Sequence, residues 1–523
     1  MPIVQQGNVN TTALVVPDLY VQIVPPQNVV INGVPTNVVG MVGTASWGPV
    51  GTPVAIGTMS DYAHTFGPIL ARKYDLGTPV AIAVQQGAWN FRCVRVTDGT
   101  DTAAAFQLPN TTLVFTALYS GSLGNQITVA LDVGSKASSW RLTVSLPGLQ
   151  PEVYDNITGS GAAFWQALAN AVNHGQGPQR GPSQLVVANP GTTSAAPVAF
   201  SWNFSYGVPG TDGATTINAT TLVGVDTLPR AGMYALRGQG CSLAVLADAD
   251  EPGSWTTQAA FGLSEGIYMI LTTQAGDNIG SAVFAKQSWG VDTYAVKLMF
   301  GDWVWWNDQA NQIVRLVSPQ GFVVGRLANL SPEQSSLNKP LYGVIGTQKS
   351  GNPGSGQLAT YSSAELSTLL SAGIDVIANP QPGGSFWGVR GGHNGSSNAA
   401  TNGDNYTRLT NYIAATLAAG MGQYVGQVVN ASLFRRIRAT QLSFLQGMLS
   451  QGLLGSTDGS LPFSVVCDSS NNPLARTGLG YVQSDAQVRY QAINEKFIVN
   501  VEGGQTVQVQ RQIVPTAPGA FAA

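Results

Sequence analysis

CSLAVLA (Cys241–Ala247) is followed by WTTQAAFGLSEG (Trp255–Gly266) and then by IYMILTT (Ile267–Thr273). The first and third stretches are short apolar runs that predict buried strands, and the second predicts a helix between them. A strand, a helix and a strand in succession are typical of a parallel sheet whose strands are joined by crossover helices. These residues therefore predict an α/β domain.

Elements on the N-terminal side extend this domain. Val29–Ala45 holds two β-branched runs around Asn32-Gly33, a pair typical of tight turns, which predicts a hairpin,. Further elements are predicted as a strand at 53–56, a helix at 76–89 and a strand at 91–97. The chain of 523 residues is long enough for several domains,. We expect a middle α/β domain built from residues 26–105 and 222–345.

Residues 106–221 differ from the sequence on either side of them. They hold short strands, many turns and one helical stretch near Ala162–His174. This pattern predicts a β-rich domain inserted into the middle domain.

The C-terminal part predicts a further α/β domain over residues 346–485. A Gly/Ser/Pro-rich stretch follows Gly346, and Ser362 with Glu365 forms a capping-box pattern that opens a helix,. Asp404 is predicted to cap a long helical region that reaches about Gly452, with a break in the 420s. Strands are then predicted at 463–467 and 482–490.

Both ends of the chain predict extended arms, residues 1–25 and residues 486–523. Apolar residues alternate with other residues over short runs in each arm, and prolines or glycines bound these runs,. Strands isolated in this way are expected to pair with a sheet elsewhere. The arm residues singled out are Leu19, Tyr20, Val21, Ile23, Phe497, Val499, Val501, Val507 and Val509. We therefore expect a structural subunit that polymerises through its ends.

The composition agrees with close packing of many copies. Charged residues make up 10% of the chain, against about 25% in an ordinary soluble domain,. A weakly charged surface repels its own copies weakly. The net charge is −3 and the basic residues are scattered, so no nucleic-acid partner is expected,.

The sequence also predicts the cellular compartment of the protein and the state of its cysteines. The start has neither a basic region nor an apolar core of a signal peptide, so no secretory signal is expected and the chain is expected to begin in the cytoplasm where it is made,. Tyr412–Phe434 is apolar but interrupted by glycines, which predicts a buried helix and no membrane insertion. Cys93, Cys241 and Cys467 are expected to be buried free thiols,.

No sequence pattern indicates catalysis or a bound group. Phosphate-loop, dinucleotide and zinc motifs are absent, so we expect no enzyme activity, no cofactor and no metal,. Asp248, Asp250 and Glu251 follow a strand, where α/β enzymes often bind ligands, but the Asp250–Gly253 stretch is more typical of a turn. An α/β enzyme that uses this acidic cluster stays open as an alternative.

Arginines form one local concentration of charge, at Arg435, Arg436 and Arg438. On a helix Arg435 and Arg438 share a side, whereas Arg436 points elsewhere. Either a solvated helix face or contact with an acidic partner surface fits this pattern.

Several motifs, in order along the chain, resemble the contractile tail sheath proteins of myovirus-type phages. They are Pro17–Val24, Val42–Pro49, Pro53-Val54, Phe66-Gly67, Ala117–Asn125, Trp387–Arg390, Tyr406–Leu417, Phe444–Gly452, Val465–Asp468 and Asn471–Pro473. Asp18, Ile23 and Gly391 depart from the family pattern. The resemblance covers nearly the whole length.

The resemblance implies a fold and a mechanism. Sheath subunits form rings, usually of six, stacked around a tail tube, and the arms of neighbours add strands to a sheet in an inner C-terminal domain. The inserted domain lies outermost. A baseplate and a terminator protein bound the sheath, whose contraction drives the tube through the host envelope for genome ejection.

The resemblance also implies a location and candidate contacts. The protein is expected in the tail sheath of the virion after assembly in the host cytoplasm, and Arg435, Arg436 and Arg438 become candidates for tube contact. The sheath of a tailocin or of a type VI secretion system is the alternative, because the same fold serves there.

Overall fold

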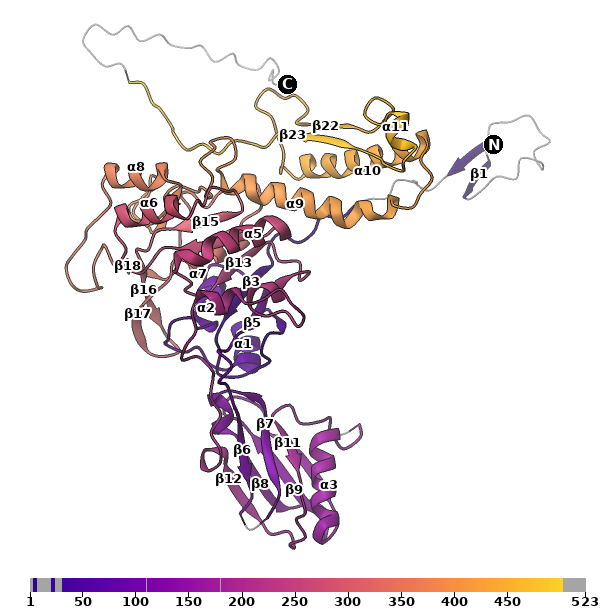
Figure 1. Cartoon of the computed structure of the whole chain (residues 1–523), viewed down its shortest axis with the longest axis vertical. Coiled ribbons are helices and arrows are strands. Elements are labelled where there is room, and N and C mark those ends of the chain that lie inside the picture. The colour runs from indigo at the N-terminus through magenta and orange to yellow at the C-terminus, as the bar shows by residue number, and fades with distance from the viewer. Residues whose placement is uncertain (1–2, 7–19, 24–30, 110, 179, 502–523) are drawn as a thin grey trace, which may run out of the picture. The chain divides into compact units, whose positions relative to one another are not determined.

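The structure is a computed structural model of the whole chain (Figure 1). It describes residues 3–6, 20–23, 31–109, 111–178 and 180–501. Residues 1–491 and residues 492–523 form two separate units. The described residues make a mixed α and β architecture with several sheets, and this level of the prediction is confirmed.

A seven-stranded sheet forms the centre of the first unit, in the order β19-β15-β14-β13-β3-β5-β4. The strands are β3 (Val39–Gly43), β4 (Pro53–Ile56), β5 (Phe91–Arg95), β13 (Leu243–Leu246), β14 (Tyr268–Thr272), β15 (Val296–Met299) and β19 (Ile374–Asp375). All neighbouring pairs are parallel except β4 with β5. The parallel sheet predicted from Cys241–Thr273 is therefore confirmed.

Helices cover both faces of this sheet and bury its apolar strands, as a parallel sheet requires. One face carries α4 (Ala219–Val223), α5 (Trp255–Glu265), α6 (Ile279–Ser288) and α8 (Ser363–Ser371). The other carries α1 (Met59–Phe66), α2 (Gly77–Gln85) and α7 (Gln320–Asn329). The capping box of Ser362 and Glu365 opens α8 as predicted.

Two small sheets flank the centre. One joins β16 (Val304–Asp308) to β17 (Ile313–Val317) and β18 (Val344–Thr347), and the other joins β20 (Ile377–Ala378) to β21 (Gly388–Val389). Trp306 lies in β16 and its indole nitrogen donates to Gln85 at 3.1 Å. This tryptophan therefore ties the small sheet to α2.

The predicted hairpin around Asn32-Gly33 is wrong. β3 pairs in parallel with β5 and β13, and residues 31–38 form no strand. A side chain on Gly33 would place its Cβ 1.9 Å from the Tyr412 hydroxyl, so the glycine allows a close approach to a helix. Packing against this helix replaces the turn that the Asn-Gly pair predicts.

The block between β5 and α4 is rich in antiparallel strands. Its sheets run β10-β9-β8-β12 and β11-β7-β6, and α3 packs against β10 and β11 (Figure 1). The elements are β6 (Ala103–Gln107), β7 (Val114–Ser120), β8 (Thr128–Val133), β9 (Trp140–Ser145), β10 (Glu152–Ile157), α3 (Gly161–His174), β11 (Val186–Asn189) and β12 (Phe200–Asn203). These strands enclose a core of their own around Phe115 and Trp165.

Arg95, at the end of β5, ties this block to the central sheet. Its guanidinium is fully buried and donates to the backbone carbonyls of Gly48 at 2.8 Å and Ser120 at 2.7 Å. A buried cation needs such acceptors to offset the loss of water. The junction is therefore held by polar bonds as well as by chain connectivity.

The C-terminal part of the first unit holds two long helices and a small sheet. They are α9 (Asp404–Met421), α10 (Ala431–Ser450), β22 (Phe463–Val466) and β23 (Asp485–Val488), with the short α11 (Leu474–Thr477) between the strands. A 3-10 turn at Gly422–Tyr424 follows α9, so the break predicted in the 420s is confirmed. Phe444 and Leu445 of α10 pack with Phe463 and Val465 of β22.

Tyr412–Phe434 is not the buried helix that its composition predicts. Val425 and Val428 are 85% and 79% exposed, and the segment leaves one helix before it enters the next. All three cysteines are buried, as predicted. Within the described residues, no helix is long and apolar enough to cross a membrane.

Candidate functional site

The N-terminal arm residues lie in a short parallel ladder. Tyr20, Val21 and Ile23 belong to β2 (Tyr20–Ile23), which pairs with β1 (Ile3–Gln6). The predicted strand therefore exists, but it has a partner within its own arm. Leu19 lies outside the described residues, and the pairing of this arm with another subunit stays a prediction.

The C-terminal arm residues that the structure describes form no strand. Phe497, Val499 and Val501 are 82%, 64% and 85% exposed in the second unit. The alternating pattern alone does not produce a strand here, because a strand needs a partner for its backbone groups. Val507 and Val509 lie outside the described residues.

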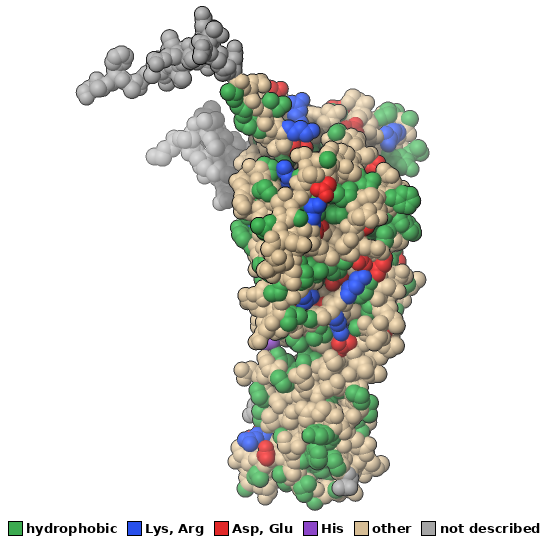
Figure 2. All heavy atoms as spheres, turned by 90° about the vertical axis from the view of Figure 1, so that its left-hand side faces the viewer, with side chains coloured by type: hydrophobic (Ala, Val, Ile, Leu, Met, Phe, Trp, Pro, Cys, Tyr) green, Lys and Arg blue, Asp and Glu red, His purple; other side chains and the backbone are tan. Residues whose placement is uncertain are grey.

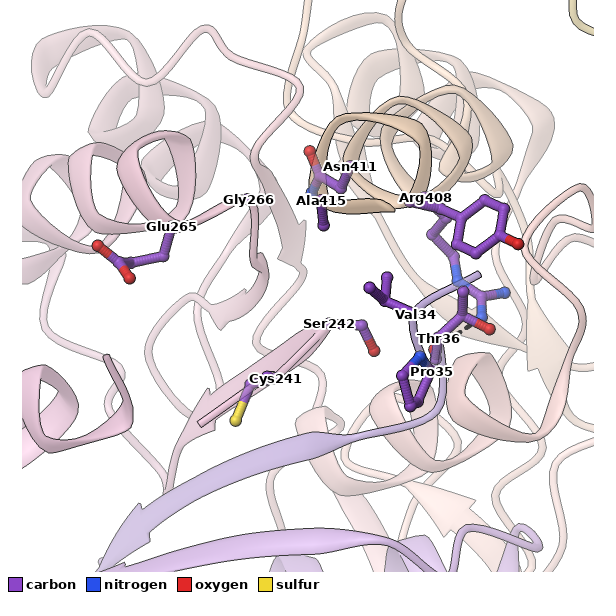
Figure 3. Close-up of a pocket in the computed structure, with 12 residues that line it drawn as sticks. Val34, Pro35, Thr36, Cys241, Ser242, Glu265, Gly266, Arg408, Asn411 and Ala415 are labelled. Atoms are coloured by element: carbon purple, nitrogen blue, oxygen red, sulfur yellow. Dashed lines mark hydrogen bonds between the residues drawn. The ribbon is translucent and has the colours of Figure 1, made fainter. Parts of the chain in front are cut away.

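The root of the N-terminal arm is fixed to α9. Val34 donates its backbone N–H to the Thr416 hydroxyl at 3.2 Å, and Arg408 donates to the Thr36 carbonyl at 3.4 Å. A pocket of about 210 Å³ lies where this segment passes between α9 and the start of β13 (Figure 3). Residues 34–36 are therefore held against α9.

The β22–β23 sheet has only two strands in the described chain, so each strand has one outer edge. Arg489 donates its N–H to the Pro462 carbonyl at 2.7 Å. Hydrogen-bonded pairs alternate along an antiparallel ladder, so the backbone groups of Phe463 and Val465 point away from β23,. We call this side the outer edge of β22.

Arg438 lies against the outer edge of β22. Its Nε donates to the Val465 carbonyl at 3.1 Å, which places the guanidinium beside the middle of the strand. The three predicted arginines are all exposed on α10, but they differ in contacts. Arg436 donates to Gln427 at 2.7 Å, and Arg435 makes no hydrogen bond or ion pair with another described residue.

Asp404 is buried at the first turn of α9 and does not cap the helix as predicted, since Gly403 takes the capping position. One carboxylate oxygen lies 3.0 Å from the Lys297 ammonium and 2.6 Å from the Tyr268 hydroxyl. The other accepts from the backbone N–H of Ser336 at 3.1 Å. The start of α9 is thereby joined to β14 and β15.

Lys297 is the centre of this buried network. Its ammonium is fully buried and lies 2.7 Å from Asp375, and it also donates to the His393 carbonyl at 2.8 Å. Burial acts to raise the pKa of Asp404, but the Lys297 ammonium and the hydroxyls of Ser336 and Tyr268 lower it to about 2. Burial acts to lower the pKa of Lys297, but the two carboxylates raise it. Both groups are therefore held in their charged forms.

Sequence reasoning missed this network, although one signal was present. Lys297 stands inside the apolar run AVKLMF (Ala295–Phe300), and Asp375 stands between Ile374 and Val376. Charged residues are almost never fully buried unless they are paired. Opposite charges in two buried strands therefore indicate an internal ion pair.

The acidic cluster after β13 is bound by the chain itself. Asp248 accepts the Tyr74 N–H at 3.3 Å, Asp250 lies 2.8 Å from the Lys73 ammonium, and Glu251 accepts from the Tyr74 hydroxyl. Burial raises the pKa of Asp248 to about 6. These contacts fasten the loop at residues 72–75, which agrees with a structural use of the cluster. Among the described residues, no group of His, Cys, Asp or Glu is placed to hold a metal ion.

Comparison of the sequence with family models gives no match, and comparison with curated proteins gives none either. Solved structures do match. The sheath tail protein of Desulfitobacterium hafniense matches with a TM-score of 0.58 at 15% identity, over 85% of this chain and 92% of that chain. The chain has the fold of a contractile tail sheath protein.

Other matches to this sheath fold are a second sheath tail protein and the sheath of an injection system. The sheath tail protein of Listeria innocua gives a TM-score of 0.58 at 15% identity, over 84% of this chain and 90% of that chain. The sheath complex of an extracellular contractile injection system, in its contracted state, gives 0.54 at 12% identity, over 95% and 99%. The sheath fold therefore spans most of the chain.

Proposed function

We propose that the protein is a structural subunit of a contractile sheath that polymerises around a tail tube. The observation that carries this proposal is the sheath fold along most of the chain, together with the exposed C-terminal segment Phe497–Val501. Neither feature calls for catalysis, so we propose no enzyme activity.

The small C-terminal sheet supports a specific mode of assembly. It has two outer edges, and the chain has two arms with apolar alternation. In this proposal each edge accepts an arm from a neighbouring copy by strand addition, which joins backbones without fixing the angle between the globular bodies. Rings, most simply of six, would stack through these joints.

The surface composition supports dense packing. Figure 2 shows that Lys, Arg, Asp and Glu side chains are few and scattered on the face drawn, with uncharged atoms between them. Exposed apolar residues add to this, among them Val425, Val428, Leu474 and Leu479. Val425 lines one surface hollow together with Tyr481, which is also exposed, and apolar surface of this kind is typical of surfaces that become covered on assembly,.

Contraction follows from such a lattice as rigid-body rotation of the subunits into a shorter and wider arrangement. The free energy that drives contraction would come from contacts between subunits in the lattice. The extended state would persist because its conversion to the contracted state is slow. In a phage the C-terminal domain would face the tube, the inserted domain would lie outside, and a baseplate and a terminator protein would bound the sheath. Contraction would then drive the tube through the host envelope for genome ejection from the virion.

The likeness to the sheath of an extracellular injection system favours a second candidate, the sheath of a related injection machine such as a tailocin or a type VI secretion system. A phage sheath and the sheath of a related injection machine are both expected to form the same kind of polymer from the purified protein.

Electron microscopy of the purified full chain tests the proposal. We expect long hollow cylinders with a regular helical repeat. Small oligomers that persist at all concentrations, with turnover of a substrate, would instead support the α/β enzyme.

We propose Arg435 and Arg436 for the tube contact, because Arg438 donates to a backbone carbonyl of β22, whereas Arg436 donates only to the Gln427 side chain. The double variant Arg435→Glu, Arg436→Glu is expected to polymerise normally but to enclose tube several-fold less often, because each exposed charge contributes only about 0.2–1 kcal/mol. Negative-stain images of sheaths assembled with tube give the enclosed fraction.

Lys136→Glu with Arg141→Glu is the matched control, since it reverses two exposed charges in the inserted block. Full enclosure of tube by the Arg435/Arg436 variant, or equal loss in the control, would remove this assignment.

A further inference from the structure

The two outer edges of the β22–β23 sheet are not equivalent. On β22 the Val465 carbonyl accepts a hydrogen bond from Arg438, at 3.1 Å. On β23 the outward backbone groups belong to Ala486 and Val488, and they receive no side-chain hydrogen bond from any described residue. One edge is therefore occupied by a cationic side chain, and the other is open.

A strand that adds to the outer edge of β22 needs the same groups. In an antiparallel or parallel ladder the incoming backbone would use the N–H and C=O of Phe463 and Val465. The Arg438 guanidinium already uses the central carbonyl and lies beside it, so an incoming strand must displace it. Charged side chains at sheet edges are one means by which natural proteins limit strand addition.

The described part of the C-terminal arm is the better candidate for the incoming strand. Phe497, Val499 and Val501 alternate along the arm, are exposed and have no strand partner in the described chain. β2 of the N-terminal arm already pairs with β1. An unpaired strand gains more from a new edge than a paired one does.

We propose that Arg438 guards the outer edge of β22 and that the segment Phe497–Val501 of a second copy adds there only by displacing its guanidinium. This inference rests on the proposed sheath function. The guard slows strand addition between free subunits, so polymerisation depends on the other contacts of a growing lattice. Arg438 is then a regulator of assembly and not a residue that contacts the tube.

Arg438→Gln tests the guard, and Arg435→Gln is the matched control on the same helix. Both residues are exposed, so both variants should fold. The probe is a fluorescent peptide of residues 494–510, titrated by anisotropy onto each full chain below its polymerising concentration. We expect Arg438→Gln to bind the peptide about tenfold more tightly than the natural chain does, the scale of one charged hydrogen bond. Arg435→Gln should bind as the natural chain does.

The possible outcomes distinguish failure of the proposed role of Arg438 from failure of the proposed sheath function. Equal or weaker binding by Arg438→Gln, or no binding of the peptide by any chain, overturns the guard. A peptide of residues 12–26, from the N-terminal arm, is titrated in the same way. If Arg438→Gln binds only this second peptide more tightly than the natural chain does, the assignment of the C-terminal arm is wrong. Cylinders formed by the natural chain would leave the sheath function standing in each case, whereas their absence would remove that function as well.

Discussion

Removal of residues 1–25 is expected to leave a folded chain that no longer polymerises. The fold should survive because the arm root is held to α9 by bonds from residues 34 and 36, which the deletion leaves in place. Loss of even three backbone hydrogen bonds between neighbours, at about 1 kcal/mol each, raises the critical concentration on the order of 100-fold. Sedimentation and electron microscopy measure the polymer, and circular dichroism measures the fold.

A chain with a scrambled arm is the control for this deletion. The same residues in an order that breaks the alternation keep the length, charge and composition of the arm, so this chain should also fail to polymerise. A truncated chain that forms normal cylinders would show that the N-terminal arm does not join subunits. An unfolded truncated chain would show instead that the arm belongs to the folded body.

Lys297→Met is expected to lower the free energy of unfolding by about 3–5 kcal/mol, because it leaves two buried carboxylates without their cation. Asp404→Asn should cost less, since Lys297 keeps Asp375 as a partner. Lys349→Met is the control, because its ion pair with Glu365 is partly exposed and such pairs contribute about 0–1 kcal/mol,. Urea denaturation gives the three values.

The same network predicts how stability depends on pH. The folded pKa of Asp404 is about 2, below its ordinary value of 3.8, so its contribution is present above about pH 4 and is lost as the pH falls towards 2,. The folded pKa of Lys297 lies above 10.5, so its contribution is present below that pH and is lost as the pH rises through the folded value. Equal stability of Lys297→Met and Lys349→Met at pH 7 would contradict both expectations.

In the contractile lattice proposed above, this network would matter because it joins two regions of the subunit into one body. Asp404 opens α9, and its partners lie on the central sheet at Tyr268 and Lys297. Arg408, one turn further along α9, donates to the Leu330 and Ser331 carbonyls at 2.9 Å each. If the subunits rotate on their terminal arms as proposed, the subunit has to move as a rigid body, since motion inside it would absorb the rotation.

Elements with strong local patterns were predictable from the sequence. Cys241–Thr273 gave a parallel strand, helix and strand, and Ser362 with Glu365 gave a helix start. The break between α9 and α10 followed from the glycines of the 420s. In these places the period of the apolar residues and the local backbone chemistry agree with the tertiary environment.

Other features could not be predicted, because they depend on which distant segments of the chain come into contact. Asn32-Gly33 has the local preference for a hairpin, but Gly33 is used for contact with Tyr412 on a helix far along the chain. Asp404 has the local preference for a helix cap, but in the structure its carboxylate is buried and forms an ion pair with the Lys297 ammonium from β15. Arg435, Arg436 and Arg438 look alike in the sequence, and only their distances to β22 and Gln427 separate them.

The sequence by itself determined the α/β character of the chain, its low charge and the alternation in its two ends, because these follow from composition and from the spacing of neighbouring residues. Only the tertiary structure decided that α9 is locked to the central sheet and that Arg438 occupies one edge of the β22–β23 sheet. Each of these depends on an atom far away in the chain. Local spacing carries no information about such distances, because the fold alone sets them.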